Sequence, residues 1–498
     1  MEVFLIIGMC YVEYSLQGGE RMSLPTLPIE KAYFTFIFPF NFKQLRREEL
    51  MEKLEKIHFT FFNIEDEAQQ NLFYPSGLTI SHQELAHFFY PFIEEKLFPK
   101  RHSKQGLFRF SKKFDLQGIL QTPNCSTQFN VNSLDVWFCP ANIGMIAVRV
   151  ELLEAMEISE VIHFAHYFRM LEPQLEEEKS VKFKMQDKIF DTFFELLKGE
   201  LIPFFGKYLV EYESVLQYGR DVPFFEDKRM YTTALLMTEH GEVDDANLFR
   251  LGQIDGYDKH GQPFMSTTNN RYIQKYIEEH VHNRWVPNAY TVITNQTYMH
   301  ITNVAVAHKL KSIESFFSTA YYNVIVHYFY KIILLKLSYE HSEIEWEREK
   351  FIVDELIREI MNFSSHYYFD GVAVQSEGRE ISTMLRKQFR IAPQYTEIKE
   401  TLNELYRIID DHASERRNKL LFILTIFTVI SGIYGMNLVI KELNRGFTWD
   451  LIHDYTFFEW IALIVILFGV GLSFYLVGNF IYNGMMLKRK QRKWQKYR

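Results

Sequence analysis

The sequence is poor in cysteine and lacks a glycine-rich phosphate loop. Its three cysteines, Cys10, Cys125 and Cys139, form no CxxC pair and no spacing typical of a metal knuckle, so a disulfide scaffold is not expected. No Walker-type loop is present, which argues against pumping driven by ATP. No Ser-His-Asp or Cys-His arrangement stands out. We therefore expect neither an enzyme nor an organic cofactor.

Charged residues are missing from two long stretches near the C-terminus. The first runs from Leu420 to Met436, and at about 1.5 Å per residue it covers roughly 25 Å. This length can cross a thin or locally adapted hydrocarbon core. The second, Phe457 to Ile481, has Glu459 as its only charge. The sequence therefore predicts two transmembrane helices, over 418–437 and 457–484.

Basic residues predict how this hairpin is oriented. Arg416, Arg417 and Lys419 precede the first run, and seven basic residues fall in the last eleven positions of the chain. The connecting loop, 438–456, holds two basic residues. By the positive-inside rule we expect both termini in the cytoplasm, the loop outside and the protein in the cell membrane. The tail, 485–498, reads as an anchor on the lipid surface rather than a nucleic-acid patch.

The first run ends in Tyr434-Gly435-Met436-Asn437. A C-terminal pair of spans, the first ending in this tetrapeptide, with a basic tail after the second, resembles the CorA family of divalent-cation channels. The best-known substrate of that family is magnesium. The motif-bearing likeness covers the C-terminal part of the chain, and a looser likeness of layout extends over the rest.

The resemblance implies an ion-selectivity site at Gly435, Met436 and Asn437. In the family this Asn forms the outer ion-binding ring, Gly435 would permit the tight turn, and Tyr434 would pack against it. Because Mg²⁺ dehydrates reluctantly, a ring of neutral amide oxygens that contacts the hydrated ion avoids most of the dehydration cost. The alternative is that Asn437 is an ordinary helix C-cap.

Small and polar residues share one face of the first predicted span. They fall within an arc of roughly 100° on a helical wheel. The set comprises Asn418, Leu421, Thr425, Thr428, Gly432 and Gly435. Such a face suits close helix packing and also suits a pore lining, and both readings hold if the pore helices pack together. Two spans per chain cannot enclose a pore, so we expect a homo-oligomer, which the resemblance implies is a pentamer.

Three acidic residues are further candidates for metal binding. In the family, cytoplasmic carboxylates between subunits bind magnesium and keep the channel shut, which suggests Asp410 and Asp411, although paired acids on a helix usually form a solvated face. Glu442 would supply an acid near the outer mouth. The family often has a Met-Pro pair in the first span and Met-Pro-Glu-Leu after the Asn, whereas this chain reads IFTVIS and LVIKELNRGFTWD. These departures concern ion preference and gating rather than topology.

The sequence before the spans predicts an α/β domain over 23–340 with a mixed, partly antiparallel sheet, and a helical stalk region over 341–417. Segment 1–22 is a doubtful leader without the features of a signal peptide, and one hypothesis places the true start at Met22. The expected strands are Ala32–Phe42, ending at Pro39, then a hairpin of 134–138 and 143–152, and finally 229–238 and 289–302. The expected helices are 159–170, 181–197, a buried helix over 321–337 with His327 as a core histidine, and 343–363.

A long stalk helix is expected to begin near Pro393 and to continue through the membrane to Asn437. It would span about 45 residues, or roughly 67 Å. Its cytoplasmic part has a 4-3-4 apolar spacing that resembles a coiled-coil seam. The seam consists of Ile398, Leu402, Leu405 and Ile409.

These features together predict a channel that passes hydrated divalent cations, with Mg²⁺ as the transported ion and a candidate regulatory ion. An inside-negative potential supplies about 2.3 kcal/mol per charge per 100 mV, so uptake needs no other energy source. One alternative keeps the architecture but moves Zn²⁺, Co²⁺ or Ni²⁺. Another is a sensor or scaffold whose spans only anchor it to the membrane.

Overall fold

The computed structural model describes residues 24–42, 46–208, 228–342 and 350–435, with short gaps among 76–86 and at 104, 174, 240–241 and 310, and scattered residues from 456 to 475. The predictions made for segment 1–22, Met436, Asn437, Glu442 and the tail 485–498 lie outside the described residues. Most of the second predicted span lies outside them as well.

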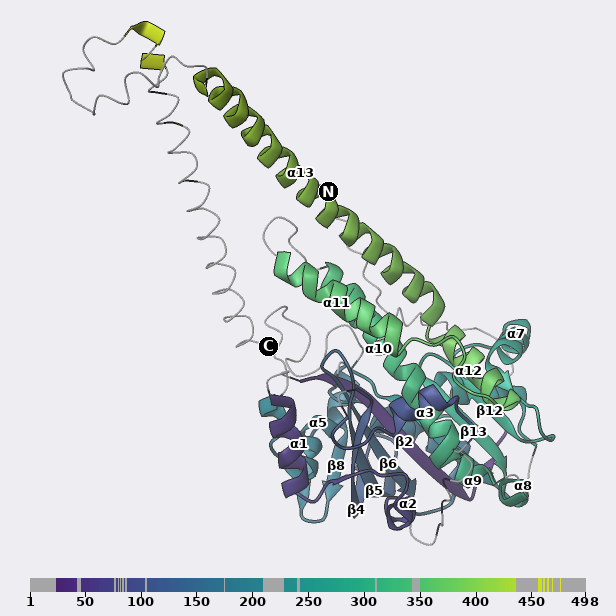
Figure 1. Ribbon diagram of the computed structural model, residues 1–498. Helices are drawn as coiled ribbons and strands as arrows, with labels where there is room; N and C mark the ends of the chain where they lie inside the picture. The colour runs from purple at the N-terminus through teal and green to yellow at the C-terminus, as the bar shows by residue number, and fades with distance from the viewer. Residues whose placement is uncertain are drawn as a thin grey trace.

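The domain is built on one large mixed sheet, as predicted (Figure 1). Its order is β11-β12-β13-β10-β2-β6-β5-β4-β8-β9, with β3 paired to β4. All neighbours are antiparallel except β10 and β13. The two remaining strands, β1 and β7, pair with each other. The strands are β1 (Pro28–Ile29), β2 (Lys31–Asn41), β3 (Thr60–Phe61), β4 (Phe108–Gln121), β5 (Ser126–Phe138), β6 (Ile143–Leu152), β7 (Met156–Glu157), β8 (Lys182–Met185), β9 (Lys188–Phe190), β10 (Tyr231–Thr238), β11 (Val281–His282), β12 (Tyr290–Ile293) and β13 (Thr297–Asn303).

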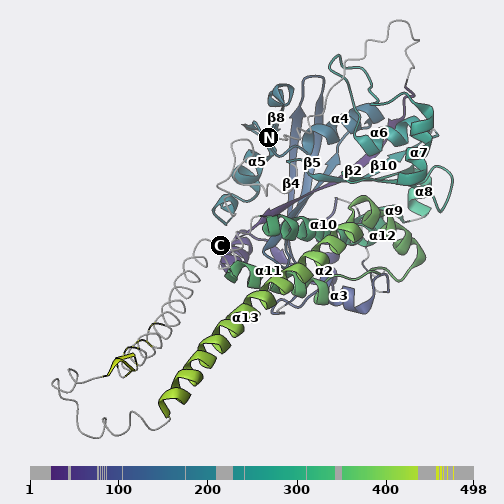
Figure 2. The same cartoon turned by 90° about the horizontal axis from the view of Figure 1, so that it is seen from above.

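Helices cover both faces of the sheet, so the domain has three layers (Figure 2). Successive side chains of a strand point to opposite faces. Accordingly, Phe34, Phe36 and Phe38 of β2 pack with α4 and α5, while Ile37 packs with α10 to α13 on the other face. The α-helices are α1 (Arg47–Lys56), α2 (Glu67–Leu72), α3 (Pro91–Leu97), α4 (Ile158–Phe168), α5 (Phe193–Leu196), α6 (Asp245–Gln253), α7 (Asn270–His280), α8 (Val304–Lys309), α9 (Ser312–Ser315), α10 (Tyr321–Ser342), α11 (Lys350–His366), α12 (Ser376–Gln388) and α13 (Ile391–Gly435).

The predicted hairpin is present as β5 and β6, which pair from Phe138 and Gly144 outward. Ala141 and Asn142 in the turn both have φ of 57°. The Cys139 backbone N–H donates to the Ile143 carbonyl at 2.8 Å and closes the turn. The strands predicted at 229–238 and 289–302 are also present, the latter as β12 and β13.

Two local predictions are wrong. Strand β2 does not end at Pro39 but continues to Asn41, with Pro39 opposite Met145 of β6. Pairing with the other neighbour, β10, reaches only as far as Ile37, which lies opposite Tyr231. No strand on that side therefore requires an N–H from residue 39.

The helix expected over 181–197 is instead the hairpin of β8 and β9, followed by the short α5. Along β8 the exposure alternates, with Phe183 and Met185 buried in the core beneath α4. Pairing with β4 satisfies this period-2 pattern, and Gln186, with φ of 51°, forms the turn.

The buried helix is confirmed as α10. Its length is 22 residues, and most of its side chains are buried against the sheet and α11 to α13. His327 is fully buried, with Nδ1 2.8 Å from the Asn323 carbonyl oxygen. Burial lowers the pKa of His327 to about 3, so the imidazole is neutral.

The α10 side of the sheet also holds a buried ionic cluster. Asp135 on β5 lies 2.7 Å from a guanidinium nitrogen of Arg149 and 3.1 Å from Nε of Arg109. It accepts further hydrogen bonds from the Tyr321 hydroxyl at 2.6 Å and the Ser111 hydroxyl at 2.7 Å. The cluster ties strands β4, β5 and β6 to the start of α10.

Helix α13 is 45 residues long and runs unbroken from Ile391 to Gly435, which confirms the predicted long helix as far as the described residues reach. Its first turns pack on α10, α11 and α12, and its far end projects away from the domain (Figures 1 and 2). Among the described residues, no helix has both the length and the apolarity needed to cross a membrane. The two transmembrane helices therefore stay predictions.

The interpretation of the stalk residues as a seam between subunits is wrong for its described members. Ile398 and Leu405 are 1% and 0% exposed, and Leu402 packs beside them, all within the core of their own chain. The 4-3-4 spacing marks the face of α13 that docks on α10 and α11. The side chain of Ile409, the fourth member of the predicted seam, lies outside the described residues, so for Ile409 the interpretation stays a prediction.

Candidate functional site

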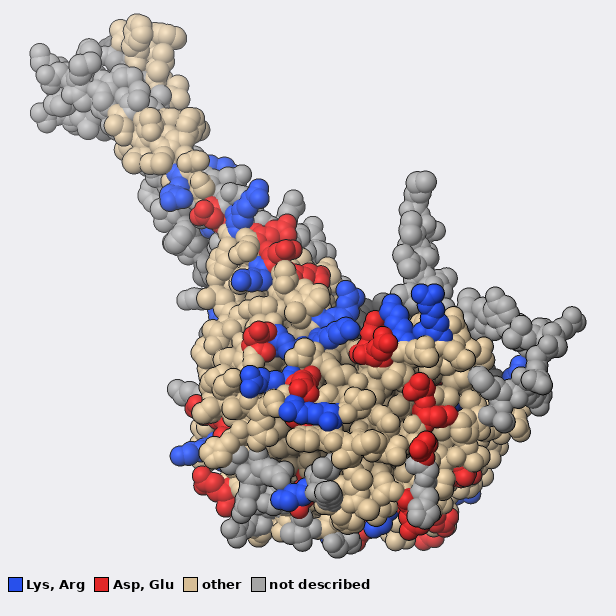
Figure 3. Space-filling model, turned by 90° about the vertical axis from the view of Figure 1, so that its right-hand side faces the viewer, with Lys and Arg blue, Asp and Glu red and all other residues tan. Residues whose placement is uncertain are grey.

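The far part of α13 exposes a band of large apolar side chains. Leu420, Phe422 and Leu424 are 62%, 67% and 60% exposed, respectively. In Figure 3 charged side chains cover the base of this helix, whereas its far end is tan. Exposed apolar surface of this extent marks a site that contacts a partner or a lipid phase.

The described members of the predicted pore face lie on this band. Asn418, Leu421, Thr425 and Thr428 are all exposed on α13. Gly432, Tyr434 and Gly435 fall in the last turns of the same helix. The structure places these residues on one element, and the four whose surroundings it describes, Asn418, Leu421, Thr425 and Thr428, are exposed.

The two threonine side chains bond to their own helix. The Thr425 hydroxyl donates to the Leu421 carbonyl at 2.8 Å, and the Thr428 hydroxyl donates to the Leu424 carbonyl at 2.7 Å. Each hydroxyl oxygen then retains lone pairs that point outward as acceptors. Water molecules bound to a cation donate hydrogen bonds, so this arrangement suits contact with a hydrated ion.

The acidic candidates for binding between subunits stay predictions, because the side chain of Asp411 and the whole of Glu442 lie outside what the structure describes. Asp410 is exposed on α13, and Asp411 follows it in the same helix. Throughout the described residues, no group of three or more His, Cys, Asp or Glu side chains is arranged to hold a metal ion.

Two sequence patterns have spacings that zinc sites use, but histidines of both have other partners. The patterns are His163 with His166, and the group Glu278, Glu279, His280 and His282. His163 on α4 has Nε2 3.0 Å from the Thr122 hydroxyl. His280 has Nδ1 2.9 Å from the Tyr276 carbonyl, and His282 has Nε2 2.8 Å from Glu380. These histidines therefore contribute hydrogen bonds within the domain.

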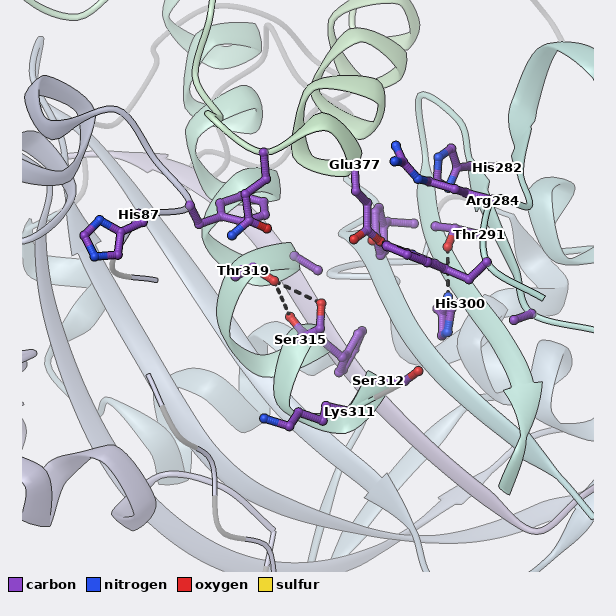
Figure 4. A pocket seen from close by; sticks show the side chains of 17 residues that line it. His87, His282, Arg284, Thr291, His300, Lys311, Ser312, Ser315, Thr319 and Glu377 are labelled. Atoms are coloured by element: carbon purple, nitrogen blue, oxygen red, sulfur yellow. Dashed lines mark hydrogen bonds between the residues drawn. The ribbon is translucent and has the colours of Figure 1, made fainter. Parts of the chain in front are cut away.

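A cavity of about 590 Å³ lies between β12 and β13, the π-helical turn η6 (Phe316–Ala320) and the N-terminus of α12 (Figure 4). Its lining includes Trp285, His300, Lys311 and Glu377. Burial, and then the nearby His282, lower the pKa of His300 to about 4, so this imidazole is neutral. The Nδ1 atom of His300 lies 2.8 Å from the Thr291 hydroxyl.

Sequence reasoning missed this cavity because its residues come from segments far apart in the chain. His87 and Glu377 both line it, although nearly three hundred positions separate them (377 − 87 = 290). No local spacing connects such residues. The available signal was His300, an ionisable residue between Met299 and Ile301 in the strand TYMHITN.

No family model, curated protein or solved structure matches this chain. Its function therefore has to be argued from the exposed band on α13, the sequence that follows it and the chemistry of the cavity.

Proposed function

We propose that the chain is one subunit of a CorA-like homo-oligomeric channel, a pentamer by the resemblance, that passes hydrated divalent cations, foremost Mg²⁺, down their electrochemical gradient. The observation that carries the proposal is the continuity of α13. One helix is anchored in the domain core at Ile398 and Leu405 and reaches Gly435, directly before Met436 and Asn437.

The exposed band supports a lipid or helix environment around the far part of α13. A solvent-exposed helix would have a polar surface on all sides unless it associates with something else. Here Leu420, Phe422, Leu424 and Phe427 are each more than half exposed. In the sequence the uncharged run continues to Met436, beyond the described side chains.

Basic side chains border this band on the domain side. Arg416, Arg417 and Lys419 are exposed on α13 immediately before Leu420. Basic residues at this place favour the cytoplasmic surface of a membrane, where lipid headgroups are anionic. The proposed orientation therefore puts the α/β domain and both termini in the cytoplasm of the cell.

The proposed pore face offers neutral oxygens rather than charges. The acceptor lone pairs of Thr425 and Thr428 and the amide of Asn437 would contact the water shell of the ion. Mg²⁺ would keep its tightly held waters, which avoids the main energetic barrier to its passage. A divalent ion gains about 4.6 kcal/mol from a 100 mV inside-negative potential, which is twice the value for one charge.

The test is ion flux into proteoliposomes that contain the full chain. Wild type is expected to pass Mg²⁺, and Asn437→Ala is expected to lose flux or selectivity. Asn295→Ala, an exposed turn residue of the domain, is the matched control and should conduct like wild type. Absence of flux for every divalent ion would refute the channel and favour an anchored sensor or scaffold. Flux of Zn²⁺ without Mg²⁺ would refute the ion assignment alone.

A further inference from the structure

The cavity beside β13 has the size and the mixed lining of a small-molecule site. Its volume of about 590 Å³ falls within the range of roughly 300–1,000 Å³ that is usual for ligand pockets. Aromatic, hydroxyl and charged side chains all contribute to the wall. The site lies in the α/β domain, away from the proposed pore.

One wall is an indole held in place by a hydrogen bond. Trp285 is 52% exposed as a residue, and its Nε1–H donates to Glu377 Oε1 at 2.9 Å. The Arg284 guanidinium lies 5.2 Å from the ring centroid and donates to Glu380 Oε1 at 2.7 Å. A planar apolar surface that is fixed and still exposed suits stacking against a planar ring.

Glu377 determines which ring edge fits beside the indole. A carboxylate only accepts hydrogen bonds, and one of its two oxygens already accepts from Trp285. The ring edge that meets Glu377 therefore has to present N–H donors. Guanine presents two adjacent N–H groups on one edge, whereas adenine presents an acceptor beside its amino group.

His300 supplies a polar atom without a partner. Its Nε2 is buried and makes no hydrogen bond to any described residue. Leaving such an atom unpaired is unfavourable, and a ligand polar group in the cavity would pair with it. The Thr291 hydroxyl can either donate to Nδ1 or accept from it. Nε2 of the neutral imidazole can therefore be the acceptor or the donor of a hydrogen bond to a ligand.

The opposite end of the cavity suits an anion. Lys311 lies at the far end from Glu377 (Figure 4), and its Nζ is 3.9 Å from Glu314 Oε2, a long ion pair. The Thr319 hydroxyl, which donates to the Ser315 carbonyl at 3.4 Å, lies 2.9 Å from the Ser315 hydroxyl, so the Ser315 O–H can still donate to a ligand. An ammonium and a hydroxyl donor that line the same cavity suit a phosphate group.

We propose that this cavity binds a guanine nucleotide, with the base stacked on Trp285, its donor edge on Glu377 and its phosphate toward Lys311. The proposal concerns binding alone and includes no phosphate transfer, so it is compatible with a sequence that lacks a Walker-type loop. The proposal does not rest on the proposed channel function, and either can hold without the other.

The experiment is calorimetric titration of the full chain in detergent with GMP as the probe. Saturable binding is expected, weaker by about tenfold or more in Trp285→Leu and in Glu377→Gln, because stacking or a charge-assisted hydrogen bond is lost. Lys275→Gln, an exposed lysine on α7, is the control and should bind GMP like wild type.

Two further titrations distinguish the ends of the ligand. Guanosine should bind more weakly than GMP and should not respond to Lys311→Met, and AMP should bind more weakly than GMP. Thermal melting shows whether each variant is folded. Absence of saturable GMP binding to wild type, equal binding by all folded variants, or tighter binding of AMP than of GMP would overturn the proposal.

Discussion

Asp135 provides a test of how strands β4, β5 and β6 are held to the start of α10. It is fully buried between two guanidinium groups and is the acceptor for both. Burial by itself raises the pKa of Asp135, but the charges of Arg109 and Arg149 and the hydrogen bonds outweigh burial and hold this pKa well below its usual range. The carboxylate is therefore charged throughout the neutral range.

Asp135→Asn keeps the shape of the side chain but removes the charge that compensates two buried cations. Breaking a buried ionic group in this way costs about 3–5 kcal/mol. For a domain of this size we expect the Tm to fall by roughly 5–10 °C. The measurement is thermal unfolding followed by circular dichroism.

Asp187→Asn, in the exposed turn between β8 and β9, is the matched control and should leave the Tm unchanged. Because the pKa of Asp135 is depressed in the folded state, its stabilisation is fully present above the unfolded pKa of about 4 and is lost as the pH falls toward the lower folded pKa. The variant should lack this component of acid sensitivity. A Tm equal to that of the control would show that the cluster does not stabilise the fold.

Two other substitutions test the packing around α10 and α13. Leu405→Ala should lower the free energy of unfolding by about 2–5 kcal/mol without altering the oligomeric mass, because Leu405 packs within its own chain. The control is Glu404→Ala at an exposed position. Dissociation of the assembly by Leu405→Ala would instead support a seam between subunits. His327→Asn should remove a pH dependence. The pKa of His327 is lowered to about 3 in the folded state, whereas in the unfolded chain this histidine gains a proton below about pH 6.5. Wild type should therefore lose stability as the pH falls from about 6.5 toward 3. Chemical unfolding at several pH values should show a smaller loss for the variant.

The elements that sequence reasoning predicted well have a strong local pattern. The β5–β6 hairpin has alternating apolar residues around Pro140, and α10 is apolar on nearly all sides. Segment 181–197 is compatible with a helical period and with an alternating strand period. The alternation of lysine and apolar residues along β8 indicates the strand that is present. The 4-3-4 apolar spacing of the stalk predicts a buried helical face, and Ile398 and Leu405 are buried. The spacing alone does not indicate whether the same chain or another subunit covers that face.

The buried cluster and the cavity depend on contacts across the fold, which no local spacing encodes. Even so, each left a trace in the sequence. Arg109, Asp135 and Arg149 are each flanked on both sides by apolar residues, in the stretches FRF, LDV and VRV, where a buried charge has to find a partner. Such isolated polar residues in a buried strand are the signal that would have indicated both sites.

Helix α12 links the two proposed sites. Glu377 in its first turn lines the cavity, and the same helix packs on α10 and on the start of α13. If both proposals hold, a nucleotide that alters the position of α12 changes the support of the proposed pore helix. Linkage then requires that GMP changes the affinity for the divalent ion by the same factor by which the ion changes the affinity for GMP. Titration of the full chain with GMP, in the presence and absence of Mg²⁺, measures this factor. Glu377→Gln is the control. An affinity for GMP that is independent of Mg²⁺ would show that α12 does not couple the sites.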